Sequence, residues 1–145
     1  MKILTFDIEE WFHILDNEST NDISKWSKYE SRIHKNLDFI LDTINKFEYK
    51  ASFFILGWMV EKYPDIVKKI DSEGYLIGSH TYLHQLVYNQ NKKTFYEDVK
   101  KSIFQLEDCI GKKVKMFRAP GFSITKKNIW AFEILFELGI EIDSS

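Results

Sequence analysis

Residues 51–80, ASFFILGWMVEKYPDIVKKIDSEGYLIGSH, contain one complete strand–helix–strand unit. The apolar runs at 51–57 and 75–80 each predict a short buried strand. Between them, residues 58–74 have helical periodicity, with a break or restart at Pro64 and a C-terminal cap at Gly74. Strands joined by a helix pair in parallel through a right-handed crossover, so this unit predicts an α/β fold.

The rest of the chain repeats the alternation. Further strands are expected at 2–6, 114–117 and 140–143, a loop at 14–28, and helices over 33–47, 94–110 and 125–138. The expected helix starts are a capping box at Ser27 and Glu30, a second at Thr94 and Glu97, and a cap at Thr125. This order fits both an open doubly wound sheet and a (β/α) barrel. Residues 1–145 are expected to form one domain that is C-terminally incomplete, because a fifth strand is a poor place for a barrel to finish.

The composition is that of a globular protein. Of the 145 residues, 44% are apolar and 29% charged, which argues against disorder. A net charge of −2 gives no electrostatic case for binding nucleic acid or an anionic membrane. The single cysteine, Cys109, excludes an internal disulfide framework. No signal peptide or membrane-spanning segment is visible, so a cytoplasmic location is expected; a homo-oligomer is left open.

Chemically distinctive residues gather directly after the expected strands. In chain order they are Asp7, Glu9 and Glu10, then Gly57 and Trp58, then Ser79, His80 and His84, then Arg118, Pro120 and Gly121. Ligands of parallel α/β folds bind at the carboxyl ends of the strands. Acid, histidine and arginine are therefore expected on one rim.

Two of these groups predict a metal site. Asp7 and Glu9 share one side if the strand persists, and His80 and His84 face the same way on a helical turn. Three protein ligands with one open position is the pattern of catalytic zinc. Alone, each signal has an ordinary explanation, namely a solvated loop or a chance histidine pair. Residues 117–122, FRAPGF, predict a shaped loop in which Arg118 could pair with a rim carboxylate, the alternative being a plain Pro-Gly turn.

Three stretches together resemble a known family. TFDIEEWFH (5–13), SHTYLH (79–84) and FRAPGFS (117–123) look like the first three motifs of polysaccharide deacetylases with the NodB-homology domain, carbohydrate esterase family 4. ASFFILGW (51–58), HQLVY (84–88) and DSS (143–145) resemble a subgroup associated with bacterial exopolysaccharide clusters. The resemblance implies a distorted (β/α), TIM-like barrel, often of seven strands, of which the first five are expected here. It also implies metal-dependent removal of N-acetyl groups from the amino sugars of a polysaccharide.

The resemblance also implies roles for individual residues. Asp7 would be the general base and Arg118 the group that holds it. Glu9, His80 and His84 would bind a divalent metal, with zinc as the first choice and cobalt, nickel or manganese as alternatives. The family more often has two adjacent aspartates in its first motif, so Glu10 is the alternative acidic ligand. Substrate contacts are expected from Trp11, His13, Pro120, Gly121 and Phe122.

One expected part of the family site has no counterpart. The general acid of the family is a histidine from a later motif, and His13 and His34 are the only other histidines in the chain. Two alternatives therefore stay beside the deacetylase: a cyclic amide or imide hydrolase on the same scaffold, and a non-catalytic carbohydrate-binding module or fragment.

Overall fold

The computed structural model describes residues 3–15 and 17–145. In this part of the chain there is one five-stranded sheet, formed by β1 (Leu4–Ile8), β2 (Ala51–Ile55), β3 (Leu76–Ser79), β4 (Met116–Phe117) and β5 (Ile142–Asp143). All neighbouring strands are parallel and follow chain order, β1-β2-β3-β4-β5. A doubly wound sheet reverses its strand order at a switch point. The order found here is instead that of successive strands in a (β/α) barrel.

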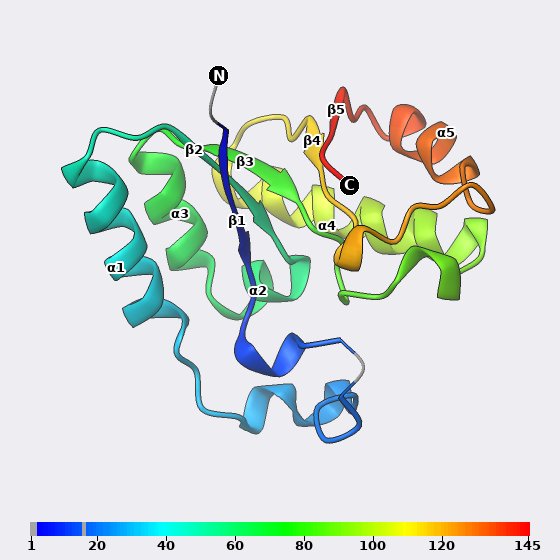
Figure 1. Cartoon of the computed structure of the whole chain (residues 1–145), viewed down its shortest axis with the longest axis horizontal. Helices are drawn as coiled ribbons and strands as arrows, with labels where there is room; N and C mark the ends of the chain where they lie inside the picture. Colours follow the sequence, from blue (N-terminus) through cyan, green and yellow to red (C-terminus); the bar gives the residue numbers. More distant parts are fainter. Residues whose placement is uncertain (1–2, 16) are drawn as a thin grey trace.

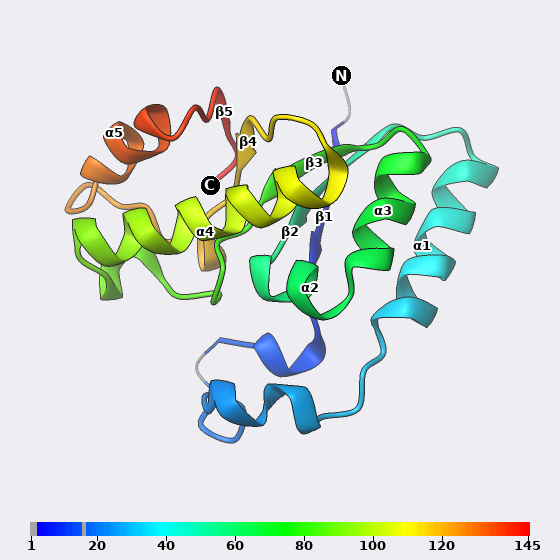
Figure 2. The same cartoon turned by 180° about the vertical axis from the view of Figure 1, so that it is seen from behind.

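The helices cover one face of this sheet (Figures 1 and 2). They are α1 (Ile33–Lys46), α2 (Gly57–Lys62), α3 (Pro64–Ser72), α4 (Lys92–Ile110) and α5 (Trp130–Glu137). The strands lie in front of α4 in Figure 1, and α4 lies in front of the strands in the reverse view of Figure 2. Short 3₁₀ turns, η1 (Trp11–His13), η2 (Ile23–Lys28), η3 (Val87–Asn89) and η4 (Pro120–Phe122), follow β1, β3 and β4 on the way to the next helix.

The core fills the layer between sheet and helices. Phe53 and Ile55 of β2 are fully buried, and they belong to one apolar cluster that includes Leu41 of α1, Ile70 of α3 and Leu106 of α4. Full burial of such side chains contributes about 1.5–3 kcal/mol each to folding. The helices packed against one face of the sheet therefore hold the strands, and with them the strand ends, in place. No helix within the described residues is long and apolar enough to cross a membrane.

Most predicted elements are confirmed, most of them with shorter bounds, while α4 begins two residues before its predicted start at Thr94. All five strands exist, although Lys2 of the first predicted strand lies outside the described residues. Pro64 is the first residue of α3, so the predicted restart is correct, and Gly74 has a φ of +81° after that helix. The predicted loop at 14–28 contains η2, apart from residue 16, which lies outside the described residues.

The three predicted helix caps are wrong, although α1 begins at the predicted residue, Ile33. Ser27 lies within η2 and does not cap a helix. The N-cap residue of α1 is Arg32, whose side chain makes no capping hydrogen bond. Asn91 caps α4: its Oδ1 accepts from the Thr94 amide, and Thr94 Oγ1 accepts from the Asn91 amide. Thr125 instead starts a turn, in which the Asn128 Oδ1 accepts from the Thr125 amide, and α5 follows only at Trp130.

Candidate metal centre

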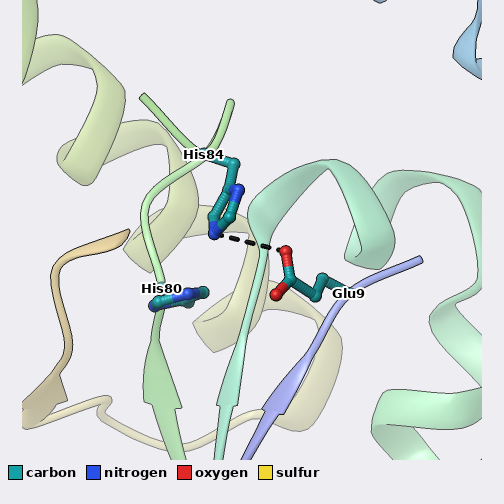
Figure 3. A group of neighbouring side chains, drawn as sticks. All are labelled: Glu9, His80 and His84. Atoms are coloured by element: carbon teal, nitrogen blue, oxygen red, sulfur yellow. Dashed lines mark ion pairs between the residues drawn. The ribbon is translucent and has the colours of Figure 1, made fainter. Parts of the chain in front are cut away.

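Glu9, His80 and His84 point toward one another beyond the carboxyl ends of β1 and β3 (Figure 3). One ligand atom from each lies within 4.8 Å of the others, and His84 Nε2 is 3.2 Å from Glu9 Oε2. His80 and His84 are 2% and 6% exposed. Glu9 Oε2 is buried and has no hydrogen-bond partner among the described residues. A cation would satisfy this oxygen, and two imidazoles with one carboxylate form a catalytic type of zinc ligand set.

The two imidazoles are held in the tautomer that a metal requires. His80 Nδ1 lies 2.8 Å from the Arg118 carbonyl oxygen, and His84 Nδ1 lies 2.8 Å from the His13 carbonyl oxygen. A carbonyl can only accept, so both Nδ1 atoms carry the proton and both Nε2 atoms keep a lone pair. Carbonyl partners of this kind orient metal-bound histidines in general.

Burial shifts the protonation of all three groups in the metal-free site. Burial, and then the nearby Asp7, raise the pKa of Glu9 to about 7. Burial, and then His80, lower the pKa of His84 to about 4, and burial is also the main cause that lowers the pKa of His80. The histidines are therefore neutral near pH 7, as metal ligands must be.

The turn from His80 to His84 is not the predicted helical turn. Thr81 and His84 have φ of +66° and +57°, a left-handed conformation that costs energy for residues other than glycine. The Asp98 carboxylate on α4 accepts from the amides of Tyr82 (2.8 Å) and Leu83 (3.1 Å). Thr81 Oγ1 accepts from the His84 amide. The two histidines converge because of this clamped turn rather than by helical spacing.

The amino end of α2 supports the same turn. The amides of Gly57 and Trp58 donate to the carbonyls of Thr81 and Tyr82 over 2.8 and 3.2 Å. At Gly57 a Cβ would lie 2.7 Å from Tyr82 Cδ2 and 3.0 Å from the Ser102 Cα, so only glycine fits there without displacement. The end of β2 therefore supports the histidine turn without placing a ligand at the site.

Asp7 and Arg118 form the ion pair that the sequence suggested. Arg118 Nη1 donates to Asp7 Oδ1 over 2.7 Å, while Asp7 Oδ2 lies 4.0 Å from His80 Nε2. The other guanidinium donors go to Thr5 Oγ1 and to the hydroxyl and carbonyl of Ser144. The guanidinium also lies 4.3 Å from the centre of the Phe54 ring. The orientation of Asp7 is therefore set from β4 and the residues after β5.

Glu10, the alternative acidic ligand, points away from the centre. Its carboxylate accepts from the amides of Arg32 and Ile33 at the start of α1 and from Ser31 Oγ. The group whose ligand atoms converge with those of the two histidines contains Glu9 and not Glu10. The geometry therefore favours Glu9 as the acidic member.

The expected substrate residues lie in different surroundings. Trp11 is 46% exposed and its indole nitrogen donates to the Glu30 carbonyl. His13 is 2% exposed behind His84, in contact with the rings of Phe12, Trp26 and Trp58. Burial, and then the neighbouring His84, lower the pKa of His13 to about 3. The 3₁₀ turn Pro120–Phe122 has left-handed residues at Gly121 and Phe122, and the Phe122 ring is 66% exposed.

Three participants were not predicted from the sequence as parts of the site. Asp98 looks like any polar residue of an amphipathic helix, and Thr5 like any residue of a strand. Ser144 lies in the DSS stretch, whose family resemblance implies no role for it. All three contribute hydrogen bonds to residues at least fifteen positions away. No local pattern reports such distant partners.

A cavity of about 420 Å³ lies next to His84, between the β1–α1 and β3–α4 connections. Its lining includes Trp26, Asn21 and Gln85, which is the combination of aromatic and amide groups common in ligand pockets. A larger cavity of about 820 Å³ lies at the opposite, amino end of the strands, lined by residues such as Leu4, Ala51 and Leu76. None of the candidate metal ligands lines that larger cavity, so only the smaller one adjoins the chemistry.

Comparison with known proteins gives one consistent answer. The profile of the family "Polysaccharide deacetylase" matches residues 3–140. A peptidoglycan-N-acetylglucosamine deacetylase from Bacillus cereus is 37% identical over 95 residues, which are 65% of this chain and 34% of that protein. The chain thus spans about a third of that relative's length.

Solved structures agree with the profile. A crystal structure of a polysaccharide deacetylase from Mycobacterium smegmatis superposes with a TM-score of 0.80 at 22% identity, over 97% of this chain and 49% of that one. A peptidoglycan N-acetylglucosamine deacetylase superposes with a TM-score of 0.72 at 28% identity, over 97% and 54%. These matches confirm the predicted NodB-type α/β fold, and with the profile match they show that the chain belongs to the polysaccharide deacetylase family.

Proposed function

We propose that the protein is a metal-dependent hydrolase that removes N-acetyl groups from amino-sugar residues of a polysaccharide. The observation that carries the proposal is the buried group of Glu9, His80 and His84 beside the Asp7–Arg118 ion pair. The names of the relatives, which are deacetylases of peptidoglycan N-acetylglucosamine, support the substrate class. The stretches at 51–58, 84–88 and 143–145 favour an exopolysaccharide as the polymer.

Glu9, His80 and His84 would hold the metal, which supplies Lewis-acid activation of water and of the acyl oxygen when bound. Asp7 is placed to act as the base, because Oδ1 is taken by Arg118 while Oδ2 faces the histidines. Arg118 holds and aims the Asp7 carboxylate, so the oxygen Oδ2 is available to take a proton from the attacking water. Phe122 and Trp11 are exposed aromatic rings that we propose as sugar contacts.

The remaining histidines do not supply a general acid within the described residues. His34 is exposed and pairs with Asp65 at 2.8 Å, and His13 is enclosed behind His84. This observation keeps the non-catalytic carbohydrate-binding reading as a second candidate. Activity and metal binding are therefore best tested separately.

The first experiment measures zinc in the purified chain by mass spectrometry, for wild type, His80→Ala and His84→Ala. His34→Ala is the matched control, because it removes an exposed histidine. Wild type and control should hold one equivalent of zinc and the other two variants should lose it. Equal zinc in all four proteins would reject the site.

The second experiment measures acetate released from N-acetylglucosamine oligomers with zinc or cobalt added. Acetate release that Asp7→Asn abolishes supports the deacetylase. Ring opening of a cyclic imide without acetate release would favour the cyclic amide hydrolase. Oligosaccharide binding without any metal-dependent hydrolysis would favour the binding module.

A further inference from the structure

The His84 imidazole is oriented by the backbone of a segment that follows β1. Its Nδ1 donates to the His13 carbonyl over 2.8 Å, so Nε2 faces Glu9. If that carbonyl moved away, Nδ1 would lose its acceptor and the ring could take the other tautomer. The position of the His13 carbonyl therefore decides whether His84 presents a lone pair to the centre.

The His13 carbonyl is held by a closed turn with Glu10. The His13 amide donates to the Glu10 carbonyl over 2.9 Å, and the Glu10 amide donates to His13 Nδ1 over 3.0 Å. The second bond assigns His13 the tautomer with its proton on Nε2. Both residues are almost fully buried, at 2% and 3% exposure. The turn has two reciprocal bonds and no solvent competing for them.

The Glu10 side chain then ties this turn to α1. Its Oε1 accepts from Ser31 Oγ (2.5 Å), the Arg32 amide (2.9 Å) and the Ile33 amide (3.1 Å). The N-cap residue of α1, Arg32, makes no capping hydrogen bond with its own side chain. A carboxylate at this position also interacts favourably with the amino end of the helix dipole. Glu10 therefore connects a rigid helix to the turn that faces His84.

We propose that Glu10 is a positioning residue of the metal centre: by anchoring the turn Glu10–His13 to α1, it places the His13 carbonyl on His84 Nδ1 and fixes the tautomer that presents Nε2 to the metal. The proposal rests on the proposed function for the identity of the site, but the tautomer it assigns exists before any metal binds. A purely structural role, capping α1, would require the same three bonds and no effect on His84.

The test uses Glu10→Ala, which removes the acceptor of all three bonds, with Glu30→Ala as matched control. Glu30 lies in the same β1–α1 connection, and its side chain is 78% exposed. Its substitution removes the same negative charge. Long-range ¹H–¹⁵N NMR of the imidazoles in the metal-free chain reads the tautomers directly, and titration with Zn²⁺ alone gives the dissociation constant. In Glu10→Ala we expect a mixed His84 tautomer and a dissociation constant raised by roughly 10–100-fold, the usual effect of losing a partner that orients a ligand. The control should match wild type in the His84 tautomer and in the zinc dissociation constant.

Two outcomes would overturn the proposal. One is a Glu10→Ala variant that melts at a lower temperature but keeps the wild-type His84 tautomer and zinc affinity, because that is the result of helix capping alone. The other is wild-type chain whose His84 carries its proton on Nε2, a result that does not depend on the variant folding. A wild-type chain that binds no zinc would instead reject the metal centre, and the tautomers would still decide the role of Glu10.

Discussion

Arg118 Nη1 donates to Asp7 Oδ1 over 2.7 Å, which joins the ends of β4 and β1 across the two strands between them. Four further contacts of the guanidinium, with Thr5, Ser144 and the Phe54 ring, use nearly every donor it has. The planar fork of arginine makes this set of contacts, and the single ammonium of a lysine does not.

Arg118→Lys should therefore destabilise the chain. We expect the free energy of unfolding to fall by about 1–3 kcal/mol, because part-buried acceptors lose their donors while the charge is kept. Urea denaturation measures this. Arg32→Lys, at the only other arginine, is the control, since its side chain is 61% exposed and should change stability by less than about 0.5 kcal/mol. Equal losses for the two variants would contradict the central role of Arg118.

Asp98→Asn should loosen the histidine turn. Asparagine keeps one acceptor oxygen but brings an amide group against one of the two backbone donors, Tyr82 and Leu83. We expect a loss of about 1–3 kcal/mol in stability, with weaker zinc binding. Calorimetric zinc titration checks the second effect. Asp108→Asn, an exposed position on the same helix, should change neither quantity, and similar behaviour of the two variants would refute the clamp.

Gly57→Ala should disturb the same turn from the side of α2. The added Cβ would lie 2.7 Å from Tyr82 Cδ2, so the ring or the helix has to move. Overpacking of this kind costs about 1–3 kcal/mol. Thermal unfolding should show this loss for Gly57→Ala. The control, Lys62→Ala at the exposed end of α2, should unfold at the wild-type temperature. A Gly57→Ala chain as stable as wild type would show that Tyr82 moves freely.

Zinc affinity should fall as the pH drops below about 7. Burial raises the pKa of Glu9 to about 7, so below that pH a proton occupies the carboxylate, while the His84 pKa of about 4 leaves that imidazole neutral. Because zinc must displace the proton, the dissociation constant should rise by about tenfold per pH unit below 7 and level off above. Competition with a chromophoric chelator measures it. Glu9→Gln should bind more weakly with no such slope, and a wild-type affinity independent of pH would exclude Glu9 as the ligand.

The sequence was sufficient to predict the parallel sheet and the rim on which the candidate ligands meet. Short apolar runs alternating with helical stripes require parallel strands, and parallel strands bring Glu9, His80 and Arg118 to one rim whatever the details of the loops. The acidic ligand stayed ambiguous between Glu9 and Glu10, because adjacent residues differ only in where the backbone turns after β1.

The local geometry needed the structure. Capping boxes were expected at Ser27 and Thr94, but α1 takes its cap from Glu10, which is distant in sequence, and α4 from Asn91. His84 was expected on a helical turn and has a positive φ instead. For α1 and for the histidine turn, tertiary hydrogen bonds from Glu10 and Asp98 override the local preference, and such partners leave no periodic signal. The cap of α4 is local, but it lies three residues before the predicted one.

The candidate ligands come from both sides of β2, which contributes none of them. Glu9 follows β1, the histidines follow β3, and within the described residues β1 pairs with β2 alone. A bound ion would thus act as a cross-link that closes the long chain segment between Glu9 and His80 and reduces the entropy of the unfolded chain. Amide hydrogen exchange in β1 should then slow more on metal loading than exchange in α4, so the metal would protect an outer strand as well as supply chemistry.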